Sequence, residues 1–146
     1  MKIGRSILTA FVFAVCVGLF NTNGFALGKD VSPEVSEDVR IIAATARLES
    51  ERETIVVYAE GLCCPSCAIG VRKMISKLDF VDRSRFNKGV TLDTKTQLVT
   101  VALSTSDGVD LDALSKAIDK AGYEPVRAYS LEGEELVTRS IKLVSE

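Results

Sequence analysis

Three cysteines within five residues, Cys63, Cys64 and Cys67, separate two segments of different pattern in this chain of 146 residues. Residues 53–60, before the cluster, are rich in β-branched and aromatic side chains, which predicts a strand. After the cluster, apolar residues recur at spacings of four, four and three, which predicts an amphipathic helix opened by Pro65. The cysteines are therefore predicted to lie at a junction between a strand and a helix.

The rest of the pattern continues as strand, strand, helix and strand. Residues 90–92 and 98–103 are predicted to be extended, and Asp110 is expected to cap a second helix that Gly122 closes. Residues 123–131 read as a last strand. This order predicts an α+β, ferredoxin-like βαββαβ sandwich: a four-stranded antiparallel sheet with two helices on one face.

The first 26 residues have the pattern of a secretory signal. Two basic residues precede an apolar run at residues 7–20, and Ala26 offers the small residue at which a peptidase cuts. The run is shorter than the roughly 20 apolar residues of an ordinary membrane span. We therefore expect a periplasmic or secreted protein after cleavage near Ala26, with an uncleaved anchor as the alternative. Cys16 lies in the run and is expected to leave with the peptide.

Three further segments follow the signal. Residues 27–52 are predicted to be a polar spacer or a short helix, residues 53–130 the folded domain, and residues 131–146 a C-terminal extension. Residues 136–144 of this extension are a candidate extra edge strand. If the short helix forms, its predicted apolar face comprises Val35, Val39, Ile42 and Ala46.

The composition excludes several classes of function. The chain has no histidine, so it has neither a Ser-His-Asp nor a Cys-His catalytic arrangement, and no HExxH zinc site. Its net charge of −2 argues against a nucleic-acid partner, which would require a basic face. We accordingly predict that the chain is not an enzyme and binds no nucleic acid.

The chemistry of the cysteine cluster favours a soft metal ion. With Pro65 as the first helical residue, Cys64 is the N-cap and Cys67 lies in the first turn. Both sulfurs are then near free backbone N–H groups and the positive end of the helix dipole, which favours the metal-binding thiolate form. Two thiolates without histidine cannot form a closed tetrahedral zinc site. They favour one Cu(I) or Hg(II) ion, and Zn(II) or Cd(II) would bind more weakly.

Two segments resemble a known family. Residues 61–73 (GLCCPSCAIGVRK) are similar to the metal-binding loop of the heavy-metal-associated domain family, and residues 117–125 (AIDKAGYEP) to its second helix and the loop that follows. The family includes copper chaperones, N-terminal domains of metal-exporting P-type ATPases and periplasmic mercury-binding proteins. The resemblance covers roughly residues 54–130 and implies that Cys64 and Cys67 are the metal ligands.

The resemblance also implies partners. We expect the ion to pass to a metal-transporting membrane protein or to another metal-binding domain with a CxxC pair. A monomer is expected, and a dimer bridged by one ion is the alternative.

Four features bear on how far the resemblance extends. Leu62 stands where the family usually has a Met that packs beneath the loop. Tyr123 falls where the family places a side chain near the metal. The alternative role of Tyr123 is that of a core aromatic. Cys63 replaces a residue that is commonly Thr or polar. It is either a third sulfur ligand or a small residue pointing away from the site. Residues 83–89 are an insertion relative to the compact family pattern.

The alternative function is a thiol–disulfide oxidoreductase that uses the Cys64-Pro65-Ser66-Cys67 pair, since thioredoxin-like redox sites also lie between a strand and a helix. Thioredoxin-like folds resemble one another in a downstream proline, usually cis, beside the disulfide. After Pro65 this chain offers only Pro125, at the start of the last predicted strand. A disulfide between Cys64 and Cys67 would also prevent metal binding.

Overall fold

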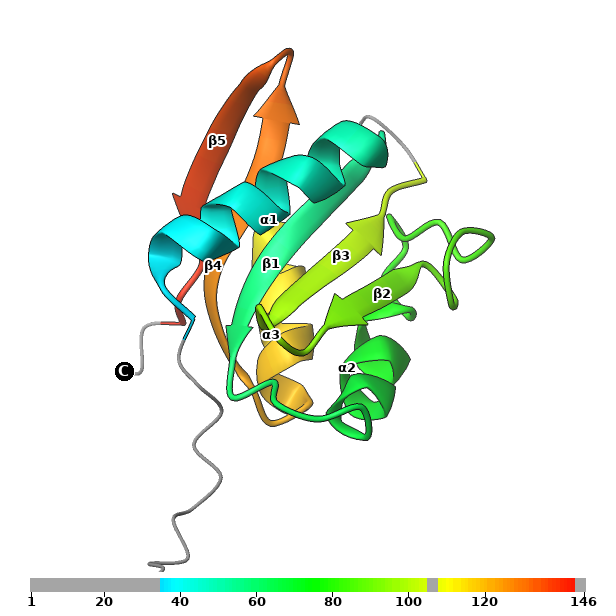
Figure 1. The fold of residues 1–146 in the computed structure, drawn as a ribbon. Coiled ribbons are helices and arrows are strands. Elements are labelled where there is room, and N and C mark those ends of the chain that lie inside the picture. Colours follow the sequence, from blue (N-terminus) through cyan, green and yellow to red (C-terminus); the bar gives the residue numbers. More distant parts are fainter. Residues whose placement is uncertain (1–34, 105–107, 144–146) are drawn as a thin grey trace, which may run out of the picture. The chain divides into compact units, whose positions relative to one another are not determined.

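The computed structural model of this chain describes residues 35–104 and 108–143. These residues form an antiparallel sheet with helices against both of its faces (Figure 1). The predicted signal segment and the first part of the predicted spacer lie outside the described residues. In chain order the elements are α1 (Glu37–Ser50), β1 (Thr54–Glu60), α2 (Cys67–Ile75), β2 (Val90–Asp93), β3 (Leu98–Ala102), α3 (Leu111–Lys120), β4 (Glu124–Glu132) and β5 (Glu135–Ser140).

The strands lie in the order β2-β3-β1-β4-β5, and each neighbouring pair is antiparallel. From β1 to β4 the elements follow the predicted order, and the arrangement is compatible with a ferredoxin-like sandwich. The prediction of four strands is wrong, because the chain turns at Gly133 and returns as β5, which pairs with β4 along its whole length. The candidate extra strand at 136–144 is thus found at 135–140.

The central strand β1 contributes to a core on each side of the sheet, because its side chains alternate between the two faces. The core shared with α2 and α3 includes Val57, Leu62, Val71, Ile75, Leu114 and Ile118. The core on the other face comprises Ala44, Leu48, Val56, Tyr58, Leu98 and Tyr129. As predicted, two helices share one face. The third helix, α1, covers the face that the predicted architecture leaves bare (Figure 1).

The buried face of α1 differs from the predicted one. The helix buries Arg40, Ala44 and Leu48, whereas Val39 and Ile42 from the predicted apolar face are 47% and 68% exposed. Both sets recur at spacings close to one helical turn, so the sequence offers two stripes for burial. In the observed stripe, Ala44 and Leu48 pack in the core with Tyr58 and Tyr129 of the sheet.

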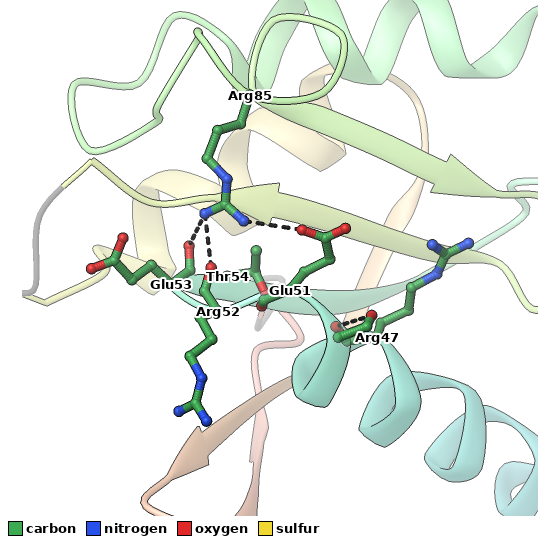
Figure 2. A network of polar contacts seen from close by, with 7 residues as sticks. Arg47, Glu51, Arg52, Glu53, Thr54 and Arg85 are labelled. Carbon is green, nitrogen blue, oxygen red and sulfur yellow. Dashed lines mark hydrogen bonds and ion pairs between the residues drawn. The ribbon is translucent and has the colours of Figure 1, made fainter.

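The inserted residues 83–89 are held against the α1–β1 connection by Arg85. Its guanidinium donates to the backbone carbonyls of Arg52 at 2.8 Å and Glu53 at 3.2 Å, and it pairs with the carboxylate of Glu51 at 3.2 Å (Figure 2). The insertion is therefore tied to the fold at the end of β1 that is remote from the cysteines.

Across residues 35–104 and 108–143, none of the helices combines the length and hydrophobicity needed to cross a membrane. The prediction of a cleaved signal concerns residues outside these ranges and stays a prediction.

Candidate metal site

The loop that carries the cysteines is anchored to the core by the residues just before them. Gly61 ends β1 with a φ of +87°, a left-handed conformation that favours glycine. Leu62 follows it and is fully buried among the side chains beneath α2. Cys63, the next residue, is exposed. One side of the loop is thus fixed in the core, while Cys63 is exposed and Cys64 and Cys67 are half-buried.

The helix α2 begins later than predicted. It starts at Cys67 with Ser66 as its N-cap, whereas the sequence predicts Cys64 at that position. The turn before it is tight, because the amide of Cys67 donates to the carbonyl of Cys64 at 3.1 Å in an i to i+3 bond. The Cys64 sulfur nevertheless accepts a hydrogen bond from the Cys67 amide at 3.3 Å. The Cys67 amide is therefore shared between the carbonyl oxygen and the sulfur of Cys64.

The three sulfurs lie close together. The Sγ atoms of Cys63, Cys64 and Cys67 are all within 4.8 Å of one another. Cys64 and Cys67 are joined by a disulfide with their Cα atoms 5.3 Å apart, whereas Cys63 is free. Both half-cystines are half-buried, so the pair is accessible from solvent. The structure thus holds the predicted ligand pair in its oxidised form, which must be reduced before a metal binds.

Among the described residues this is the only group of three or more His, Cys, Asp or Glu side chains able to share one ion. The cluster contains no carboxylate. In its reduced form it offers sulfur ligands alone, which suits soft ions.

Ser66 is a contact of the site that the sequence analysis missed. Its Oγ lies 3.2 Å from the Cys64 sulfur. Ser66 makes no side-chain capping hydrogen bond, so the preference of serine for the N-cap position did not indicate this contact.

Tyr123 reaches the base of the loop from the α3–β4 turn. It is partly buried against the core under α2 and α3, and a β-carbon added at Gly61 would lie 3.7 Å from its Cδ1. Tyr123 therefore packs beside the first residue of the loop, as its role of core aromatic requires. Its predicted role near a bound metal stays a prediction.

Comparison with known proteins agrees with this geometry. Residues 56–124 match the model of the heavy-metal-associated domain family. This part of the chain is a heavy-metal-associated domain. Its cysteine pair lies in the first loop of the matched segment, between β1 and α2.

Curated proteins also match this chain. A copper-transporting ATPase of Helicobacter pylori (strain ATCC 700392 / 26695) is 27% identical over 89 residues, which are 59% of this chain and 11% of that protein. A copper-transporting ATPase of Helicobacter pylori (strain J99 / ATCC 700824) is 26% identical over the same length and shares. This chain thus spans only 11% of the length of these relatives. No solved structure matches it with significance.

Proposed function

We propose that this protein is an exported, non-enzymatic carrier that binds one soft metal ion through Cys64 and Cys67 and passes it to a partner. The proposal depends above all on one observation: a cysteine pair with Cα atoms 5.3 Å apart lies at the start of α2 in a heavy-metal-associated domain. Reduction frees two thiolates next to the amides of the first turn. Two soft sulfurs on one side of a loop suit an ion of low coordination number.

Transfer of the ion requires access by a partner's thiolates. The pair is half-buried and Cys63 beside it is exposed, so an incoming thiolate can approach the ion as one of the two original sulfurs leaves. Such an exchange keeps the ion bound to sulfur throughout. We propose another CxxC domain or a metal-transporting membrane protein as the partner, and a monomeric carrier with a metal-bridged dimer as the alternative state.

The names of the relatives favour Cu(I) over Hg(II) as the cargo. Both ions prefer two soft sulfurs, and the cysteines alone do not choose between them. The matched proteins are named copper-transporting ATPases, so Cu(I) is the first ion to test.

The test is a titration of the full, reduced chain with Cu(I) under anaerobic conditions against a competing thiol ligand, followed by Hg(II). We expect one Cu(I) per chain. Binding should be lost in Cys64→Ser and Cys67→Ser, while the matched control Cys16→Ser, a cysteine outside the loop, should bind as the wild type does. Wild-type affinity in either loop variant would overturn the proposal.

Export is tested separately by the mass of the protein recovered from cells that express the full chain. Cleavage near Ala26 predicts a mature chain that starts at residue 27 outside the cytoplasm. A full-length chain that stays in the cytoplasm would contradict export without affecting the metal assignment.

The disulfide between Cys64 and Cys67 favours one second candidate, a thiol–disulfide oxidoreductase. That function predicts that catalytic amounts of the chain accelerate the reduction of insulin by a dithiol. A metal carrier should not accelerate insulin reduction, even at the protein concentration at which it binds one Cu(I) per chain. The two assays together separate the candidates.

A further inference from the structure

We infer that Cys63 completes a three-sulfur site with Cys64 and Cys67, and that this site takes a three-coordinate thiophilic ion of the arsenite type. The inference deepens the proposed function, since it uses the same loop, but it adds a ligand and a class of ion that a two-cysteine pair does not provide.

The spacing of the sulfurs allows all three to bind one ion. Two sulfurs that are each about 2.3 Å from an ion lie at most about 4.6 Å apart, and about 4.0 Å apart in a trigonal arrangement. The three Sγ atoms here are already within 4.8 Å of one another. Once the disulfide is opened, shifts within the range of side-chain rotation bring all three sulfurs to one ion.

The packing leaves Cys63 free to move. Its side chain is exposed and is in neither core of the fold, whereas its neighbour Leu62 is fully buried. The thiol of Cys63 is also the one in the loop that is not engaged in the disulfide. Leu62 therefore fixes the backbone next to Cys63, and the sulfur of Cys63 can reach the pair by rotation of its own side chain.

The arrangement selects the class of ion by its shape. All three sulfurs come from five consecutive residues, so they approach a bound ion from one side. Among the described residues no carboxylate joins the cluster to close a fourth position. A trivalent ion with a lone pair forms three pyramidal bonds and leaves its remaining side open, which matches such a surface.

Charge favours the same class. Three thiolates around a trivalent ion form a neutral group, whereas three thiolates around Cu(I) would carry two negative charges. Within the described part of the chain, no Lys or Arg side chain has a hydrogen bond or ion pair with these sulfurs that would compensate that excess. The third sulfur therefore contributes little to a monovalent ion and strongly to a trivalent one.

The reaction balances without a change in the oxidation state of arsenic. An external dithiol first reduces the Cys64–Cys67 disulfide: two thiols form on the protein and the dithiol becomes a disulfide. The three protein thiols then react with arsenious acid. Three As–O bonds break, three As–S bonds form, and each thiol proton leaves with a hydroxide as water.

The experiment uses the full chain with Cys16→Ser, so that the loop holds its only thiols, after reduction and removal of the reductant. Arsenite is added, and both the remaining free thiols and the affinity are measured. We expect three thiols to be consumed for each arsenic bound and three sulfur neighbours in the X-ray absorption of arsenic. In Cys63→Ser, arsenite affinity should fall on the order of 100-fold, because the third ligand acts at high effective concentration. The Cu(I) affinity of that variant should stay within about tenfold of the parent.

The outcomes separate this inference from the proposed function. If two thiols are consumed per arsenic, or if Cys63→Ser binds arsenite as tightly as its parent, the three-sulfur site is refuted while Cu(I) carriage stands. If the parent chain binds no Cu(I) but takes up arsenite through three thiols, the three-sulfur site stands and the copper proposal fails.

Discussion

The guanidinium carbon of Arg40 lies 3.9 Å from the centre of the Tyr58 ring, within the core that joins α1 to the sheet. Arg40 is 6% exposed and donates a hydrogen bond to the side chain of Gln97 at 3.3 Å. Its Nε is buried without a hydrogen-bond partner. The contact with the Tyr58 ring therefore stabilises the buried guanidinium and connects α1 to the central strand of the sheet.

Replacement of this arginine should destabilise the fold. We expect Arg40→Ala to lower the free energy of unfolding by about 2 kcal/mol, through loss of the ring contact and of the packing of the side-chain stem. Urea unfolding measures the change. The matched control is Arg47→Ala on the exposed side of the same helix, with an expected effect within about 0.5 kcal/mol. Equal effects of the two variants would show that the stack adds nothing.

A second prediction concerns two glycines with similar backbone angles and different surroundings. Gly89 has a φ of +83°, and a β-carbon there would overlap Cγ1 of Val81 and lie 2.8 Å from the carbonyl oxygen of Asp82. Gly133, at φ +71°, has open space around the same position. Gly133→Ala should cost about 1 kcal/mol, from its conformation alone. Gly89→Ala should cost at least about 3 kcal/mol, since strain and overlap add. Thermal unfolding of both variants provides the comparison, which fails if their melting temperatures coincide.

Leu62 links the stability of the core to the shape of the cysteine loop. Leu62→Ala should lower the free energy of unfolding by about 2–4 kcal/mol and also weaken Cu(I) binding, because the loop loses its anchor. Leu62→Met keeps the volume and should cost less than about 1.5 kcal/mol while preserving the affinity. Unfolding and Cu(I) titration are measured on the same samples. Unchanged affinity in a folded Leu62→Ala protein would mean that the loop holds its shape without the anchor.

Arg85 offers a test of the inserted loop. Arg85→Ala removes two hydrogen bonds to backbone carbonyls and the pair with Glu51, and should lower stability by about 1–2 kcal/mol. Proteolysis within residues 83–89 should become faster. Arg52→Ala is the matched control, since Arg52 contributes only its carbonyl and its side chain points away from Arg85 (Figure 2). Equal cleavage rates in the two variants would show that Arg85 does not hold the loop.

Local patterns predicted the elements that frame the site. The strand before the cysteines and the helix after them follow from side-chain periodicity, and the expected cap of α3 is confirmed by the hydrogen bond from the Ala113 amide to the Asp110 carboxylate at 2.9 Å. The start of α2 was placed two residues early. Proline fits the first helical position, but it is equally compatible with the tight turn that precedes Cys67 here.

The buried face of α1 and the path of residues 80–89 depend on long-range packing, which local sequence patterns do not predict. The two stripes of α1 have similar periodicity, and the buried one includes a charged residue, Arg40, which stacks on the ring of Tyr58. The path of residues 80–89 depends on side-chain bonds to backbone carbonyls of Arg52 and Glu53, which lie more than 30 positions away in sequence. For the site, the sequence predicted which cysteines take part, whereas the short distances from the Cys63 sulfur to the other two sulfurs are known only from the structure.

The position of β1 has a consequence for the proposed release of a metal ion. The strand is paired on both edges, by β3 and β4, and six of its seven residues are buried between the helices of the two faces. Its amides should therefore exchange with solvent only when the whole domain unfolds. The cysteine loop extends directly from this strand, so the three cysteines are attached to the part of the fold that we expect to exchange most slowly. For the proposed carrier, transfer of an ion should therefore need motion of the loop alone, without exposure of the core to proteases or to aggregation.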